Sequence, residues 1–201
     1  MARIEPVRSS KAGLYTRIVL HFTRRAIAEL TGKATARMVE PLEVYARLPE
    51  LFKGYAKLEQ ATGKLHRLPK RLHALAELKA ATLTHCEYCI DMGSAISRRW
   101  GLSDEELMAL PRYRTSPYFS ELDRHVLDYA VAMTRTPVEV PDDLFDKLRL
   151  HLDDDQLVEL THHIALENLR GRFNLALGIG AAGFSEGMVC ALPEGDTATG
   201  S

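Results

Sequence analysis

The sequence predicts a single all-α domain, and three observations lead to that prediction. The 201 residues suffice to bury one sizeable hydrophobic core. Apolar residues recur with the 3.6-residue period of a helix along almost the whole chain, whereas no segment shows the alternating pattern of a strand. Proline and glycine mark the ends of several periodic segments, as expected for helices joined by short loops.

The first half of the chain is predicted to form five helices. They span about residues 11–30, 37–47, 49–62, 70–85 and 86–100. Pro49 and Pro69 open two of them, and Gly32, Gly63 and Gly101 close three. The helix that follows Pro69 carries apolar residues around more than one face, so we expect it to be central and buried.

Four further helices are predicted in the second half. They span about residues 103–111, 121–134, 141–151 and 153–177, with a loop at 112–120. Ser103 and Glu106 have the spacing of a capping box, which fixes one helix start. Pro137 breaks the chain after the helix at 121–134. Glycines at 178, 180, 183 and 187 end regular structure.

We divide the chain into a basic N-terminal helical arm (1–36), a main domain (37–187) and a flexible tail (188–201). Residues 1–37 carry eight basic and two acidic side chains. This excess suits binding to membrane lipid, nucleic acid or an acidic partner. Alternatively the arm packs on the body or on a neighbouring subunit, because Leu14, Ile18, Phe22 and Ile27 form a plausible buried stripe.

Composition narrows the classes of protein. The net charge of -1 gives no reason to expect a nucleic-acid partner. No apolar run is long enough for a transmembrane segment, and the N-terminus lacks the apolar region of a secretion signal. Three cysteines do not make a secreted disulfide framework. We therefore expect a cytoplasmic protein in a reducing compartment.

The most informative pattern is the C-x-x-C formed by Cys86, Glu87, Tyr88 and Cys89. On a helix this spacing puts both sulfurs on one face, about one turn apart and close enough for a disulfide. A cysteine in the first helical turn faces unpaired N–H groups and the positive end of the helix dipole, which stabilise a thiolate. His85 is a candidate base, Glu87 opposes thiolate formation, and Tyr88 is placed to pack over the pair or donate a hydrogen bond.

Two other interpretations of the cysteines stay open. One is a zinc site, but there is no second C-x-x-C, and His66, His73, His85 and Cys190 are not spaced as further ligands. The other is a pair of inert core cysteines, because cysteine is among the most buried residue types. The sequence favours reversible dithiol–disulfide chemistry, without a metal or cofactor, since permanent disulfides are rare in a reducing compartment.

This region resembles the alkylhydroperoxidase-like (AhpD-like), or carboxymuconolactone decarboxylase, superfamily. In that signature a helix beginning Leu-Pro-x-Arg-Leu leads into C-x-x-C, and residues 68–72 here read Leu-Pro-Lys-Arg-Leu. Residues 89–95 and 167–174 are similar to the long single-domain branch of the superfamily. The resemblance covers about residues 40–185 and implies an AhpD-like helical bundle that forms homo-oligomers, with the cysteine pair near a subunit interface.

The resemblance also implies a reaction. One thiolate attacks a hydroperoxide, the sulfenic acid condenses with the second thiol, and a thiol reductant restores the dithiol. In characterised relatives the second cysteine, here Cys89, attacks and Cys86 resolves, whereas the helix dipole favours Cys86 as the more acidic thiol. The roles of the two cysteines therefore stay open.

The chain departs from the peroxidase pattern at the proton relay. Relatives carry a glutamate twelve residues before the first cysteine and a histidine four after the second, where this chain has Ala74 and Gly93. Some also have a histidine at the position of Tyr88. Glu77 lies on nearly the same helix face as Ala74, so it is the candidate for the carboxylate role, with His85 as the candidate imidazole. The alternative is that Glu77 is an ion-pair partner at the surface or an interface.

A second polar constellation lies in the last predicted helix. His163, Glu167, Arg170 and Asn174 share one helix face at three- and four-residue spacing. One interpretation is a substrate pocket beside the cysteine pair, in which Arg170 or Arg172 lowers a thiol pKa. A His163–Glu167 metal site is a second, without an evident third ligand. An interhelical ion-pair network is the third.

Together these features predict a homo-oligomeric oxidoreductase that reduces hydroperoxides or disulfides and is regenerated by an unknown thiol reductant. A non-catalytic helical scaffold or binding protein that has lost the proton relay is the alternative from another class. A carboxymuconolactone decarboxylase-type lyase fits less well, because lactone-acting members of the superfamily typically lack the cysteine pair.

Overall fold

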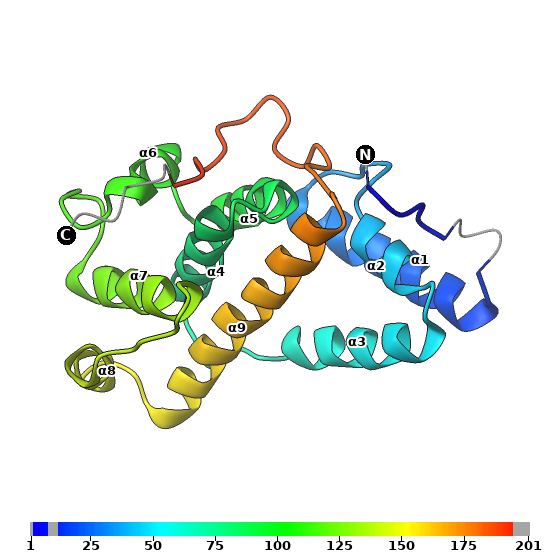
Figure 1. Cartoon of the computed structure of the whole chain (residues 1–201). Coiled ribbons are helices and arrows are strands. Elements are labelled where there is room, and N and C mark those ends of the chain that lie inside the picture. Colours follow the sequence, from blue (N-terminus) through cyan, green and yellow to red (C-terminus); the bar gives the residue numbers. More distant parts are fainter. Residues whose placement is uncertain (1, 8–11, 195–201) are drawn as a thin grey trace.

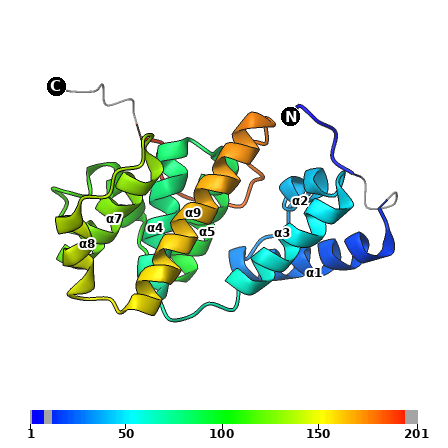
Figure 2. The same cartoon turned by 60° about the horizontal axis from the view of Figure 1, so that its bottom comes forward.

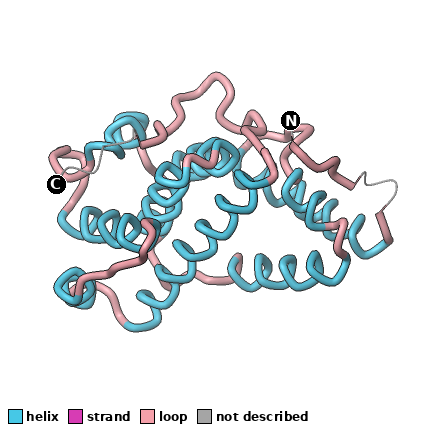
Figure 3. Tube along the Cα trace, in the orientation of Figure 1, coloured by secondary structure: helices cyan, strands magenta, loops and turns pink. Residues whose placement is uncertain are grey.

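The computed structural model describes residues 2–7 and 12–194, and over these residues it consists of helices and loops without a strand (Figures 1 and 3). The helices are α1 (Leu14–Thr31), α2 (Glu40–Tyr45), α3 (Pro49–Thr62), α4 (Lys70–Thr84), α5 (Glu87–Arg99), α6 (Asp104–Ala109), the 3₁₀ turn η2 (Leu110–Arg112), α7 (Glu121–Thr134), α8 (Asp142–Arg149) and α9 (Asp154–Ala176). This arrangement confirms the prediction of a single all-α domain. Within the described ranges, no helix is long and apolar enough to cross a membrane.

Helix α4 is the central element, as its apolar pattern predicts. It packs against α5, α7 and α9, and Leu75, Ala76 and Ala80 on its different faces are fully buried. Figure 2 shows α5, α7 and α9 gathered around α4, with α8 at one edge and α1, α2 and α3 grouped at the other end of the molecule.

Local sequence signals set several helix boundaries. α3 and α7 begin and end at the predicted residues. Capping boxes start α6, α7 and α9, where Ser103, Ser120 and Asp153 accept a hydrogen bond from the backbone N–H three residues on. Helices α1 and α2 are shorter than predicted: both start three residues later, and α2 also ends two residues earlier.

The stripe predicted on the first helix is not buried against the body of the chain. Leu14, Ile18 and Phe22 are 72%, 47% and 63% exposed. Helix α1 docks on α3 and α5 through a different face, on which Leu20 is fully buried and Ile27 is partly buried. The apolar side chains at 14, 18 and 22 therefore lie on the surface of the isolated chain.

Residues 178–194 return over α5 as an irregular segment (Figure 1). The Asp91 carboxylate fixes its start by accepting hydrogen bonds of 2.6–3.0 Å from the backbone N–H groups of residues 182–185. Further along, Ala191 is buried, and Glu194 forms an ion pair with the buried Lys79. Residues 188–194 of the predicted tail thus lie against the body, while 195–201 fall outside the described residues.

Candidate active site

The cysteine pair lies where α4 turns into α5. Helix α4 ends at Thr84, and His85 adopts the left-handed conformation with φ 57°. Cys86 is the N-cap residue of α5. A left-handed residue commonly ends a helix, and histidine is one of the few non-glycine types enriched in that conformation. This turn places Cys86 and Cys89 at the start of α5.

Cys86 and Cys89 form a disulfide, with their Cα atoms 5.2 Å apart. Both residues are buried, at 1% and 5% exposure. The Cys86 sulfur accepts a hydrogen bond from the Cys89 backbone N–H at 3.3 Å, and it takes the place of the oxygen of an ordinary N-cap side chain. The Cys86 sulfur therefore lies at the positive end of the α5 dipole.

Asn174, near the end of α9, contacts both sulfurs. Its Nδ2 lies 3.6 Å from the sulfur of Cys86 and 3.6 Å from that of Cys89. The side chain is buried, and its Oδ1 has no hydrogen-bond partner among the described residues. Once the disulfide is reduced, an N–H donor at this position stabilises a thiolate relative to a thiol.

Tyr88 and His85 have contacts that explain their places without catalysis. The Tyr88 hydroxyl donates a hydrogen bond to the Met38 carbonyl at 2.5 Å, and its ring packs edge-on against Phe184. Burial raises the pKa of Tyr88, so its phenol stays protonated. The exposed His85 ends α4. Their catalytic roles remain predictions.

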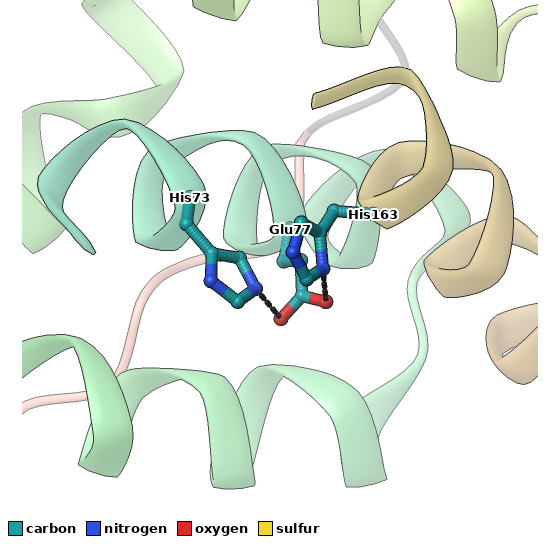
Figure 4. Close-up of side chains that lie close together, drawn as sticks. All are labelled: His73, Glu77 and His163. Atoms are coloured by element: carbon teal, nitrogen blue, oxygen red, sulfur yellow. Dashed lines mark hydrogen bonds and ion pairs between the residues drawn. The ribbon is translucent and has the colours of Figure 1, made fainter. Parts of the chain in front are cut away.

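Glu77 belongs to a separate group, the His73–Glu77–His163 cluster, between α4 and α9 (Figure 4). One carboxylate oxygen of Glu77 lies 3.2 Å from His73 Nε2, and the other lies 3.2 Å from His163 Nδ1. The two imidazole rings stack with centroids 3.5 Å apart, and Trp100 packs against His73.

The electrostatics of Glu77 do not suit a general base. Burial raises the pKa of its carboxyl, but the neighbouring His163, His73 and Arg170 outweigh burial and hold the pKa well below its usual range. A carboxylate held ionised in this way accepts a proton poorly at neutral pH. Its catalytic role remains a prediction that this environment does not favour.

Arg170 ties the cluster to two further carboxylates. It pairs with both oxygens of Glu59, at 3.0 and 2.7 Å. Its Nη1 lies 3.1 Å from Glu77 and 3.1 Å from Glu167. Burial raises the pKa of Glu167 to about 7, although Arg170 opposes the rise. These contacts are those of an interhelical ion-pair network.

The face predicted on the last helix is therefore divided between two places. Asn174 contacts the sulfurs, whereas His163, Glu167 and Arg170 lie in the ion-pair network. Arg172 donates to Asn168 at 2.7 Å, so the structure gives neither arginine a direct contact with a cysteine.

The structure does not bring His163 and Glu167 together as the metal-binding pair that the sequence suggested. His163 instead faces Glu77 on one side and Glu159 on the other. The pairing of His73 with Glu77 was not predicted, although their i, i+4 spacing on a central helix is a usable signal.

The positions of the family's proton relay are closely packed. Ala74 is buried. A Cβ atom built on Gly93 would lie 3.2 Å from Leu78 Cδ1, so a larger side chain at this position would require the Leu78 side chain to shift.

Comparison with known proteins identifies the family. Residues 49–132 match the carboxymuconolactone decarboxylase family. The uncharacterized protein YnjA of Escherichia coli K12 is 35% identical over 175 residues, which cover 85% of this chain and 91% of YnjA. The chain belongs to the carboxymuconolactone decarboxylase family. The resemblance in residues 68–95 is thereby confirmed.

Solved structures show how widely this family fold is used. An Agrobacterium tumefaciens protein of unknown function, whose name suggests an antioxidant defence protein AhpD, is 30% identical with a TM-score of 0.60, over 66% of this chain and 91% of that one. The debrominase Bmp8 is 21% identical with a TM-score of 0.73, over 89% and 91%. At that identity Bmp8 shares the fold alone, so the activity of this family member must be argued from its own site.

Proposed function

We propose that this chain is a thiol-dependent oxidoreductase in which Cys86 and Cys89 cycle between dithiol and disulfide while they reduce a small hydroperoxide. The observation that supports it best is the environment of the pair. Both sulfurs lie at bonding distance at the start of α5, and N–H groups of Cys89 and Asn174 are directed at them. These donors lower the free energy of a thiolate.

The reaction is a two-electron reduction of the peroxide. A thiolate attacks the distal oxygen of ROOH, so an S–O bond forms, the O–O bond breaks and the leaving alkoxide takes up a proton to give ROH. The second thiol then attacks the sulfenic sulfur, an S–S bond forms and water leaves. A small dithiol reductant restores both thiols by disulfide exchange and is itself oxidised.

Burial restricts the substrate class. At 1% and 5% exposure, the two cysteines are inaccessible to a folded protein disulfide, so a small hydroperoxide is favoured over a protein substrate. The same restriction favours a small thiol reductant.

The geometry and the resemblance assign the attack differently. The N-cap position and the Cys89 N–H favour Cys86 as the more acidic thiol, whereas the resemblance implies attack by Cys89. Single variants separate the two, because the attacking cysteine alone still forms a sulfenic acid that dimedone traps.

The test is hydroperoxide-dependent turnover with dithiothreitol as reductant. We expect the variant that lacks the attacking cysteine, and the Cys86→Ser, Cys89→Ser double variant, to lose turnover, and Cys190→Ser to keep it as the matched control. Equal peroxide consumption by wild type and the Cys86→Ser, Cys89→Ser double variant would contradict the proposal and favour the non-catalytic scaffold, which the missing relay at Ala74 and Gly93 also supports.

A homo-oligomer in a reducing cytoplasm accompanies this proposal. The exposed Leu14, Ile18 and Phe22 on α1 would be covered if a second copy packed there. Changing Phe22 to Asp should lower the mass measured by light scattering, and an unchanged mass would count against this use of α1.

A further inference from the structure

We propose that the His73–Glu77–His163 cluster is a zinc site, separate from the cysteine pair. Two imidazoles and one carboxylate are a ligand set that zinc uses, with a fourth position open to water. One potential ligand atom from each residue lies within 4.8 Å of the other two (Figure 4). His73 and Glu77 come from one face of α4, and His163 comes from α9.

The separations approach those of a tetrahedral site. Zinc–ligand distances of about 2.0–2.1 Å put neighbouring ligand atoms of a tetrahedron about 3.3 Å apart. His73 Nε2 lies 3.2 Å from Glu77 Oε2, and His163 Nδ1 lies 3.2 Å from the other oxygen, Oε1. To bring one oxygen and both nitrogens onto a single ion, the Glu77 carboxylate and the stacked imidazole rings must rotate.

The hydrogen bonding of His163 supports a cation at this place. His163 is buried, with Nδ1 facing Glu77 and Nε2 3.8 Å from Glu159 Oε1. Each ring nitrogen of His163 therefore faces a carboxylate. A metal on Nδ1 would leave Nε2 on the Glu159 side, where the 3.8 Å separation is longer than a hydrogen bond. A carboxylate behind a ligating histidine is the usual second partner in zinc sites.

His73 faces the same carboxylate. Its Nε2 lies 3.2 Å from Glu77 without a well-aligned hydrogen bond within the described part of the chain. A cation between His73 and Glu77 would replace this single contact with two ligand bonds. Glu77 can serve it with Oε2, because Arg170 occupies Oε1.

The balance of buried charge agrees with a divalent cation. Three carboxylates, those of Glu59, Glu77 and Glu167, pair with the guanidinium of Arg170, and a fourth, that of Glu159, lies beside His163. The carboxylates of this group outnumber its one arginine, so the group is short of fixed positive charge. A zinc ion supplies that charge, and unpaired buried charge is otherwise costly.

Zinc binding can be measured without interference from the thiols. We would use the full chain carrying Cys190→Ala in its oxidised form, because the Cys86–Cys89 disulfide offers no thiolate to a metal. After chelator treatment and addition of zinc chloride, washed protein should retain about one zinc per chain. Cobalt(II) should give the visible absorption of a tetrahedral site.

Matched histidine variants locate the site. His73→Gln and His163→Gln should retain less than about a tenth of the parent's zinc. His162→Gln should retain it, since His162 bonds Thr62 and is not part of the cluster. Equal zinc content in the His73→Gln and His162→Gln variants would overturn the proposal.

A second readout covers variants that fail to fold. Zinc should raise the Tm of the parent protein itself, because a ligand that binds only the folded state stabilises it. An unchanged parent Tm, together with no retained zinc, would overturn the site and leave the imidazoles as ion-pair partners. Neither readout depends on peroxide turnover, so the zinc site and the proposed thiol chemistry can fail separately.

Discussion

Replacing Glu167 with glutamine should remove a pH-dependent loss of stability. Glu167 is buried in the ion-pair network, and burial raises the pKa of its carboxyl from 4.5 to about 7. Because the folded state holds this proton more tightly than the unfolded state, the stabilisation is complete below the unfolded pKa. It is lost as the pH rises through the folded pKa. Glutamine has the same shape and does not titrate.

The size of the effect follows from the shift. A rise of about 2.5 units at about 1.4 kcal/mol per unit corresponds to about 3 kcal/mol between pH 4.5 and 8. We therefore expect the glutamine variant to gain stability relative to wild type as the pH rises. The difference in the free energy of unfolding, variant minus wild type, should become about 2–3 kcal/mol more positive between pH 4.5 and 8. Subtracting the two proteins removes the titration of the groups that they share.

Urea unfolding at pH 5, 6, 7 and 8 measures this difference. Glu139→Gln, at an exposed loop position, controls for the loss of one negative charge and should show no comparable trend. A difference between Glu167→Gln and wild type that stays flat from pH 5 to 8 would refute the assignment of a raised pKa to Glu167.

Three further substitutions test the packing and the chemistry. A Cβ at Gly171 would lie 2.8 Å from Thr84 Oγ1, so Gly171→Ala should lower the free energy of unfolding in urea by about 1–3 kcal/mol. Adding Thr84→Ala should restore most of this loss. A Gly171→Ala variant more stable than wild type would contradict the prediction. Asn174→Leu removes the donor to both sulfurs. Because such a hydrogen bond contributes about 1–1.5 kcal/mol, the pH midpoint of thiol alkylation should rise by about one unit. An unchanged pH profile would show that Asn174 does not stabilise the thiolate. His85→Gly keeps the left-handed turn and should keep peroxide turnover within about twofold; a loss above tenfold would show that the imidazole takes part.

Much of the fold could be predicted because its signals are local. Capping residues such as Ser103 and the helix-opening Pro49 fixed boundaries, and the apolar residues around α4 marked it as central. The face that α1 buries could not be predicted, because Leu20 and Phe22 are equally apolar. The choice between them depends on how α1 meets α3 and α5.

The candidate site also combines a feature that the sequence reveals with features that depend on tertiary packing. The cysteine pair is visible from a three-residue spacing, whereas the His73–Glu77–His163 cluster joins residues 86 positions apart. Only the packing of α4 on α9 brings Glu77 to His163. The close approach of Gly93 to Leu78 is also tertiary, so the sequence could reveal that the relay residues are missing but not what packs at their positions.

The most direct test of the central claim is a single-turnover thiol count. The fully reduced chain carrying Cys190→Ala is mixed with one equivalent of a small hydroperoxide, and its free thiols and intact mass are measured. Dithiol–disulfide chemistry predicts the loss of both remaining thiols, a mass about 2 Da lower and one equivalent of alcohol formed. Two retained thiols with unconsumed peroxide would contradict the account.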